Sequence, residues 1–201
     1  MAPANAPETL RKGLAMGAHR AVHVTDPALD GSCAVSTALV LAAALRELEF
    51  DMVFAGIDSS DGGAGIVPAA VAAHLALPYL SYASRIEPDM EKRTVGVRRI
   101  SPTGYDVLEA PLPVVIGGTQ ALGEPRYPSL KGIMAARGKE IVTRSLADVG
   151  LDDGSVGGAV ATTTVLENHL PPDRDPTEIV RGSADDGAAR IVEFLAERRI
   201  I

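Results

Sequence analysis

Hydrophobic residues recur at helical spacing in some segments of the chain and form short uninterrupted runs in others. Residues 8–16 have the apolar spacing of a helix, which is expected to end before Gly17. Residues 20–24 form a β-prone run, and the apolar positions of 32–48 recur every three or four residues, as in a largely buried helix. Residues 51–55 are a continuous apolar run, typical of a parallel strand covered on both faces. This order predicts a strand, helix, strand unit.

The next part of the pattern changes from helical to strand-like. A loop of small residues at 57–65 precedes a predicted helix at 66–77, in which Pro68 is tolerated because it falls in the first turn. Short strand candidates separated by turn sequences then predict an antiparallel excursion from the parallel sheet. These candidates are residues 79–86, 94–100 and 105–110.

A second parallel part follows the excursion. Residues 113–117 are expected to form a further buried strand, and the long irregular connection 118–130 is of a length that is often functional. It leads to a predicted short helix at 130–137, for which Ser129 is the expected cap. Another strand is predicted at 141–143.

The last fifty or so residues differ in composition from the rest of the chain. The polar, Gly- and Pro-rich stretches 151–158 and 171–176 predict a linker or an extended arm, and 183–197 has the spacing of an amphipathic helix that needs a surface to cover. We therefore predict an α/β nucleotide-binding domain at 1–149, and at 150–201 a linker with a C-terminal helix that packs on a partner subunit. The predicted fold class is α/β, with a doubly wound, mostly parallel sheet, an antiparallel excursion and a C-terminal helical arm.

Composition narrows the class of protein. Hydrophobic residues are 46% and charged residues 22% of the 201, which excludes a disordered tail protein. The net charge of −7 argues against nucleic acid as a partner. The uncharged stretches 34–45 and 62–84 are too short, or too rich in Pro and Gly, for a membrane span. The single cysteine, Cys33, allows no intrachain disulfide, and with no recognisable leader sequence a cytoplasmic location is expected.

The strongest local signal for a ligand is the loop after the strand predicted at 51–55. A Gly-rich turn between a parallel strand and a helix exposes backbone N–H groups to an anion, and phosphate is the expected ligand. The loop has neither the Gly-Lys-Ser/Thr of a Walker A motif nor the third glycine of the dinucleotide fingerprint. The alternative is a tight turn that needs small residues, with Asp61 as a helix cap only. The candidate nucleotide-binding residues are Gly56, Asp58, Ser59, Ser60, Asp61, Gly62, Gly63, Ala64, Gly65, Ile66 and Val67.

No other group of residues predicts catalysis. The four histidines lack the spacing of metal ligands, and His23 and His74 are expected to be packed and hydrogen-bonded. Cys33, next to a helix start, is expected to be a small buried residue and not a nucleophile. A Gly-x-Ser-x-Gly elbow is also missing. The sequence therefore predicts a carrier or partner subunit without a metal or catalytic site, and not an enzyme.

Several segments match the pattern of one known family. Residues 8–24 read as a helix, the turn Ala-Met-Gly-Ala-His-Arg and a strand, and residues 56–78 have the placement of a nucleotide loop and its helix. Residues 124–136, Glu-Pro-Arg-Tyr-Pro-Ser-Leu-Lys-Gly-Ile-Met-Ala-Ala, form the most distinctive stretch, and the element at 148–151 also fits. In these segments and in the C-terminal helix, which are distributed along almost the whole chain, the sequence resembles the beta subunit of electron transfer flavoproteins.

The resemblance implies a heterodimer in which an alpha subunit holds most of the FAD. The beta subunit supports that flavin, binds a structural AMP and has a sheet of the adenine-nucleotide α-hydrolase-like type. Electrons would pass from flavin dehydrogenases, such as the acyl-CoA dehydrogenases of fatty acid β-oxidation, to this flavin and on to a membrane quinone reductase. The location implied is the bacterial cytoplasm, or the mitochondrial matrix in a eukaryote, without membrane insertion.

The resemblance also assigns roles to individual residues. By position, the backbone amides of Gly65, Ile66 and Val67 would meet the AMP phosphate. Leu130, in the loop before the short helix, would be the apolar anchor that docks into partner dehydrogenases, with Arg126 and Tyr127 close to it in sequence. The alternative for Leu130 is simple packing.

The chain departs from the family pattern at a surface turn, residues 101–104, and in two places that bear on function. Family members often have Asn, Gln and Thr where this chain has Gly65, Ile66 and Val67, so only backbone donors remain for a nucleotide. About sixty residues that precede the match in the family have no counterpart, and we expect the N-terminal strands of the fold to be missing. A stand-alone adenine-nucleotide-binding stress-type sensor and a non-functional truncated remnant are the alternative interpretations. A Rossmann dehydrogenase is disfavoured because the glycine fingerprint is missing.

Overall fold

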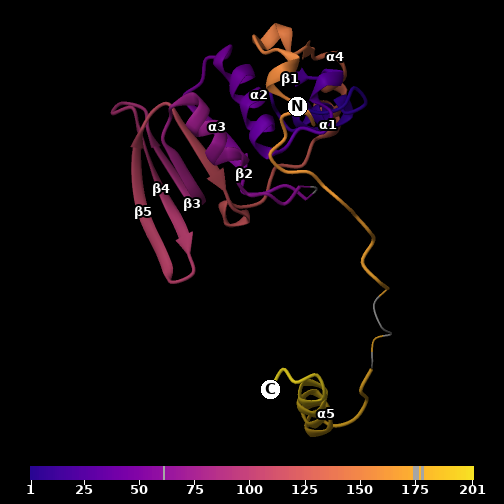
Figure 1. Cartoon of the computed structure of the whole chain (residues 1–201). Helices are drawn as coiled ribbons and strands as arrows, with labels where there is room; N and C mark the ends of the chain where they lie inside the picture. Colours follow the sequence, from indigo (N-terminus) through magenta and orange to yellow (C-terminus); the bar gives the residue numbers. More distant parts are fainter. Residues whose placement is uncertain (61, 174–176, 178) are drawn as a thin grey trace. The chain divides into compact units, whose positions relative to one another are not determined.

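A computed structural model describes residues 1–60, 62–173, 177 and 179–201 (Figure 1). The chain divides into two compact units, Met1–Thr164 and Val165–Ile201. Each unit is described by itself below. The first unit continues past residue 149, where the sequence analysis placed the end of the α/β domain.

The beginning of the first unit alternates helices and strands as predicted. Helix α1 (Pro7–Ala15) precedes strand β1 (Ala21–Val24), and helix α2 (Ala34–Arg46) precedes strand β2 (Met52–Gly56). The predicted burial of α2 is confirmed, because small and β-branched side chains along most of its length are covered. These buried residues are Ser36, Ala38, Val40, Ala42 and Ala43.

The middle of the first unit forms a mixed sheet next to one helix. Helix α3 (Val67–Leu75) has Pro68 in its first turn, as predicted, and ends at Ala76 in the left-handed conformation. In the described part of the chain the strand order is β2-β6-β3-β4-β5, with β2, β6 and β3 parallel and with β4 and β5 added antiparallel. The antiparallel excursion is therefore confirmed. The additional strands are β3 (Tyr79–Asp89), β4 (Thr94–Ser101), β5 (Gly104–Pro111) and β6 (Val114–Gly118).

Strand β3 changes its pairing along its length. Tyr79 and Leu80 pair with the parallel strand β6, whereas Arg85 and the residues after it pair with the antiparallel strand β4. Ala83 pairs with both neighbours, and the register shifts on either side of it. Tyr82, which precedes it, has φ +51°, which is rare for a residue with a bulky side chain. This irregularity marks the place where the sheet changes from parallel to antiparallel.

The end of the first unit contains helix α4 (Leu130–Gly138) and strand β7 (Ile141–Arg144). The hydroxyl of Ser129 accepts a hydrogen bond of 3.1 Å from the backbone N–H of Gly132, which confirms the predicted cap. Short 3₁₀ turns lie between the longer elements of the described chain, at Pro27–Leu29, Gln120–Leu122, Ala147–Val149 and Asp153–Ser155.

The prediction of one doubly wound sheet is wrong for the described strands. β1 pairs with β7 in a separate parallel ribbon, in the register Ala21 with Ile141, whereas β2 pairs with β6, in the register Met52 with Val114. The strand, helix, strand unit expected from β1, α2 and β2 therefore does not share one sheet. Because β2 ends the larger sheet, it has a described neighbour on one side only, and its Phe54 is 58% exposed. The expectation that this strand is covered on both faces is therefore wrong as well.

The described core of the first unit consists of three clusters of buried hydrophobic side chains. Figure 1 shows α2 and α3 side by side next to the larger sheet. Ala38, Ala42 and Val71 pack where these two helices meet. Val114 and Ile116 of β6 are fully buried and pack with Leu80, Val95 and Val97 in a second cluster. Burial of such aliphatic side chains is the main stabilising contribution of these layers. A third cluster around the ribbon of β1 and β7 contains Val24, Leu29, Val40, Ala43, Leu146, Val149 and Val156.

The segment 151–158, predicted to be part of a linker, instead packs on the first unit. Val156 is only 1% exposed and belongs to the cluster around the β1 and β7 ribbon. Gly157 has φ +77°, and a Cβ atom at this position would collide with the carbonyl oxygen of Ala28. The glycines that looked like linker residues thus allow the chain to approach the body of the unit closely.

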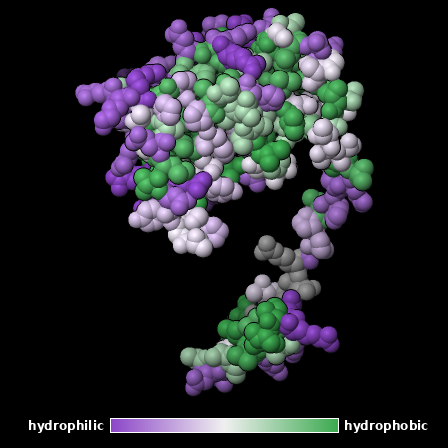
Figure 2. Space-filling view, turned by 60° about the vertical axis from the view of Figure 1, so that its left-hand side comes forward, coloured by the Kyte–Doolittle hydropathy of each residue, from purple (hydrophilic) through white to green (hydrophobic). Residues whose placement is uncertain are grey.

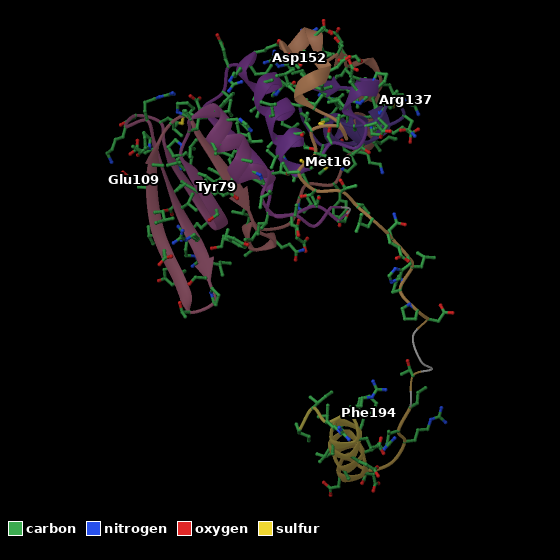
Figure 3. The ribbon with its side chains drawn as sticks, in the orientation of Figure 1. Met16, Tyr79, Glu109, Arg137, Asp152 and Phe194 are labelled. Atoms are coloured by element: carbon green, nitrogen blue, oxygen red, sulfur yellow. The ribbon has the colours of Figure 1, made fainter. Side chains whose placement is uncertain are left out.

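The second unit contains helix α5 (Ala184–Glu197), and its described residues before this helix belong to no other helix or strand. Ser183 and Asp186 form a capping box, so the predicted N-terminus of the helix is confirmed. The described residues of α5 include none that is buried, and Ile191 and Val192 are 62% and 57% exposed. Phe194 projects from the same helix (Figure 3), and hydrophobic side chains cover much of this unit's surface in Figure 2. The predicted stretch 171–176 lies only partly within the described residues.

Candidate functional site

A cavity lies at the carboxyl end of β2, where the Gly-rich loop leads into α3. Its volume is about 330 Å³, near the lower end of the range for small-molecule sites. Ala55 and Gly56 come from the end of β2, and Val67 and Pro68 from the start of α3. Thr37, near the start of α2, also lines the cavity. The loop contributes Ile57, Asp58, Ser59, Ala64 and Gly65.

Backbone groups and the side chain of Asp58 form hydrogen bonds within the described part of the loop. Asp58 Oδ1 accepts hydrogen bonds from the amide of Ser59 at 2.8 Å and from the amide of Gly65 at 3.1 Å. The amide of Gly63 donates to the carbonyl oxygen of Ser59 at 3.1 Å. Gly63 and Gly65 have φ +56° and +64°, while a Cβ atom on either would meet nothing within 4 Å. The backbone conformation, and not a lack of space, therefore favours glycine at both positions.

The starts of two helices flank the cavity. Neither the N-cap residue of α2, Cys33, nor that of α3, Ile66, provides a side-chain cap, and the first turns of both helices lack acidic residues. The first amide groups of a helix carry partial positive charge and have no partner within the helix. Among the described residues that line the cavity there is no lysine or arginine. An anion bound here would therefore be held by backbone N–H groups and hydroxyls.

Cys33 lies at the start of α2, four residues before Thr37. Its side chain is 8% exposed, and its sulfur lies 3.7 Å from the hydroxyl of Ser36 and 3.6 Å from that of Thr162. Hydrogen bonding by the backbone of Ser36, and then by Thr162, lowers the pKa of the Cys33 thiol to about 6. The predicted burial is confirmed, and the absence of a nucleophilic role stays a prediction. His23 is also buried, and its Nε2 lies 2.9 Å from the carbonyl oxygen of Ala2.

The structure brings about half of the predicted nucleotide-binding residues together. Gly56, Asp58, Ser59, Ala64, Gly65 and Val67 line the cavity. Ser60, Gly62, Gly63 and Ile66 belong to the same loop without lining it, and Asp61 lies outside the described residues. Sequence reasoning missed Thr37, because the sequence carries no signal that α2 would face this loop. Ile57 and Pro68 could have been found from their positions at the two ends of the loop.

The residues predicted to dock a partner lie on and before α4. Leu130 is the first residue of α4, not a residue of the preceding loop, and its side chain is 75% exposed. Tyr127 is 87% exposed, and Arg126 is exposed as well. The alternative prediction, that Leu130 simply packs inside the described unit, is therefore wrong.

An additional apolar side chain extends this surface. Met134 lies one helical turn after Leu130 and is 64% exposed, and Ile133 beside it is 42% exposed. Residues four apart share a face of a helix, so the spacing of Leu130 and Met134 was a signal available in the sequence. Figure 3 shows Arg137 on the same helix and Met16 just after α1.

Two further properties of the described chain concern membranes and metal ions. None of its helices combines the length and the apolar character that crossing a bilayer requires. Its His, Cys, Asp and Glu side chains form no group of three or more that could hold a metal ion.

Comparison with known proteins adds a family match. A family model described as the electron transfer flavoprotein domain matches residues 1–149. The electron transfer flavoprotein subunit beta of Mycobacterium tuberculosis is 39% identical over 200 residues, which cover 99% of this chain and 74% of the relative.

More distant relatives match over the same extent. The subunit beta of Megasphaera elsdenii is 33% identical over 211 residues, which cover all of this chain and 77% of the relative. The caffeyl-CoA reductase-Etf complex subunit CarD of Acetobacterium woodii is 32% identical over 203 residues, with the same coverage. The similarity thus includes the second unit as well as the first.

Proposed function

This chain belongs to the electron transfer flavoprotein family as a beta subunit, and we propose that it pairs with an alpha subunit to carry electrons between other flavoproteins. The observation that carries the proposal is the 39% identity to a beta subunit over 99% of the chain. The relative from Acetobacterium woodii is, by its name, a subunit of a complex. The proposed route runs from flavin dehydrogenases, such as acyl-CoA dehydrogenases, through FAD to a membrane quinone reductase.

In this proposal FAD is held mainly by the alpha subunit and supplies the electron-carrying chemistry. The described beta chain shapes the surroundings of that flavin, since protein groups near a flavin ring tune its potential. The second unit exposes apolar side chains, which include those of Leu166, Leu170 and Ile191, and these support a role of this unit in contacting the alpha subunit. The cytoplasmic location expected from the sequence stays part of the proposal.

We assign a structural AMP to the cavity between the Gly-rich loop and the starts of α2 and α3. The cavity of about 330 Å³ is of the size of a single nucleotide, and its walls offer backbone N–H groups to a phosphate. Two loop amides already converge on one carboxylate oxygen, so the loop is shaped to accept an anionic oxygen. The amides of Gly65, Ile66 and Val67 and the hydroxyl of Thr37 are the groups that would hold the nucleotide.

Leu130 is the proposed anchor for dehydrogenases that deliver electrons. A single exposed aliphatic side chain at the start of a helix, with Tyr127 and Met134 nearby, suits a transient interface in which one buried residue supplies much of the affinity. The surface is apolar at Leu130 and carries basic residues beside it, Arg126 and Lys131. Such a surface fits a partner that has an apolar pocket with acidic groups around it.

Co-expression with an alpha subunit tests the proposal. We expect a one-to-one complex with the visible spectrum of a bound flavin, which a flavin dehydrogenase reduces. Leu130→Ala should raise the KM of the complex for that dehydrogenase by about tenfold, the effect of losing one interface anchor, without changing the flavin content. Val107→Ala, which removes a similarly exposed aliphatic side chain from β5, is the control and should leave KM unchanged.

A stand-alone adenine-nucleotide sensor is the second candidate, because the same cavity supports it. It predicts that the chain binds AMP without an alpha subunit and without flavin. If co-expression gives neither a complex nor flavin, while the chain alone binds AMP, the sensor replaces the carrier as the function.

A further inference from the structure

We propose that Asp58 sets the ligand preference of the cavity, because its carboxylate holds the backbone amide that a nucleotide phosphate needs. The inference rests on the nucleotide site proposed above and concerns the class of ligand that the site accepts. Asp58 weakens the binding of phosphate groups and does not change the binding of the uncharged part of a nucleotide.

The geometry of the loop carries this inference. One oxygen of Asp58, Oδ1, accepts the amides of both Ser59 and Gly65, at 2.8 and 3.1 Å. Gly65 precedes α3 by two residues, and its amide is one of the three that would meet the AMP phosphate. A backbone N–H has a single proton to donate, so Gly65 cannot serve Asp58 and a phosphate fully at the same time.

The charges around the cavity make the competition unfavourable for phosphate. Asp58 is the only charged residue among the described ones that line the cavity, so no cation there offsets repulsion between its carboxylate and a phosphate. The side chain of Asp58 is exposed, which leaves it free to turn out into solvent when a phosphate takes its place. A phosphate therefore binds by displacing Asp58, whereas a nucleoside, which has no phosphate, has no need to do so.

The simplest opposing explanation is that Asp58 only closes the loop. In that case its two hydrogen bonds would hold the cavity in shape, and their loss would weaken the binding of AMP and adenosine alike. The two explanations predict opposite signs for the change in AMP affinity, so the sign separates them.

The experiment compares AMP and adenosine on the same protein. Binding of each ligand is measured by calorimetry on the nucleotide-free complex with the alpha subunit, for the natural chain and for Asp58→Asn. We expect Asp58→Asn to lower the Kd for AMP by about tenfold, the equivalent of one charge-assisted hydrogen bond, and to change the Kd for adenosine by less than about twofold.

The matched control is Asp89→Asn. Asp89, the last residue of β3, is also an aspartate whose Oδ1 accepts a backbone N–H, that of Lys92, at 2.9 Å. The control removes the same charge from the chain without touching the cavity, so it should leave both affinities unchanged. An equal gain for AMP in the control would assign the effect to net charge and overturn the proposal.

The remaining outcomes of this experiment also decide whether the proposal stands. Unchanged or weaker AMP binding by Asp58→Asn, with binding by the natural chain intact, overturns the role of Asp58 and leaves the nucleotide site standing. Lack of binding of either ligand to every protein overturns the nucleotide site and this inference with it. Asp58→Ala, which removes the acceptor as well as the charge, is the second variant, and its AMP affinity should also rise. The amide signal of Gly65 in nuclear magnetic resonance should shift in Asp58→Ala, which reports the loss of the contact with Oδ1 independently of ligand binding.

Discussion

At the scale of single residues, Gly132 determines how closely α4 approaches α1. A Cβ atom at Gly132 would lie 2.5 Å from the carbonyl oxygen of Ala15, a distance that real side chains do not show. Arg11 of α1 donates to the carbonyl oxygens of Ala136 and Lys139, and the ammonium group of Lys139 donates back to Leu14 and Ala18. These bonds satisfy carbonyl groups at the ends of both helices, which have no partner within the helix. The close contact at Gly132 thus fixes the helix that carries Leu130.

We expect Gly132→Ala to lower the free energy of unfolding by about 1–3 kcal/mol, because the added methyl group forces the helices apart. The intrinsic helix preference of alanine, about 1 kcal/mol in its favour, offsets only part of this. Gly13→Ala in α1 is the matched control, since a Cβ atom there meets nothing within 4 Å. Urea denaturation of the two variants should therefore show opposite changes. Equal changes would mean that α1 and α4 are not in close contact at Gly132.

The thiol of Cys33 gives the chain a pH dependence. Its folded pKa of about 6 lies below its ordinary value of about 9, so the folded state favours the thiolate. This contribution to stability is complete above about pH 9, declines as the pH falls, and is lost below about pH 6. The rate of alkylation of Cys33 in the native chain should accordingly rise with a midpoint near pH 6.

Thr162→Val tests the cause of this low pKa. Thr162 lies far from Cys33 in the sequence, yet its hydroxyl is 3.6 Å from the sulfur. Removal of this hydroxyl should move the midpoint of alkylation to higher pH. Thr163→Val is the control and should not shift it. A midpoint that stays near 6 in Thr162→Val would show that Thr162 does not stabilise the thiolate.

The residues that sequence reasoning identified correctly are those with local partners. Ser129 and Ser183 cap the helices that follow them, and each bonds to a residue three positions later. Thr37 could not be found in this way, because it reaches the cavity only through the packing of α2 against α3. The bond from Gly65 to Asp58 spans seven residues of irregular loop and follows no period that a sequence reveals.

At the scale of helices and strands, the hydrophobic pattern predicted the elements but not all of their neighbours. The helices and strands of the first unit lie within a few residues of their expected positions, because helical spacing, short apolar runs and turn residues are local properties. Pairing depends on distant parts of the chain. Strand β1 pairs with β7 and not within the sheet of β2, and nothing in the run 20–24 distinguishes the two possibilities.

Strand β2 shows why an apolar run does not reveal burial by itself. The run 51–55 reads as a strand covered on both faces, yet Phe54 is 58% exposed while its partner across the ladder, Ile116 of β6, is fully buried. The two residues lie on neighbouring strands of the same sheet. Their burial differs because β6 has described strands on both sides and β2 on one.

At the scale of the whole molecule, the buried hydrophobic residues of the described chain all lie in the first unit, the last of them being Val156. The second unit exposes Leu166 by 95% and Leu170 by 90%, and the described residues of α5 include no buried one. A helix of this length without packing is marginal in water, and its capping box adds only about 1 kcal/mol. We therefore expect the second unit to gain most of its stability from a surface that it covers.

We expect removal of residues 165–201 to leave the stability of the first unit almost unchanged while abolishing its pairing with the alpha subunit. The clusters around β6, between α2 and α3, and around the β1 and β7 ribbon all remain in the shortened chain. Its free energy of unfolding in urea should therefore stay within about 0.5 kcal/mol of that of the full chain, as for changes away from packed features. Co-purification with the alpha subunit should be lost, because the exposed apolar side chains of the second unit are removed.

A milder variant separates loss of the apolar surface from loss of the whole segment. Ile191→Glu keeps the chain complete and places a charge on the apolar face of α5, where Ile191 is 62% exposed. If α5 covers an apolar surface of the alpha subunit, this one charge must be buried without a partner, and pairing should weaken strongly with the stability of the first unit unchanged. Loss of several kcal/mol from the first unit in either variant would instead show that α5 stabilises this same chain. Unchanged pairing in both would place the contact with the alpha subunit on the first unit.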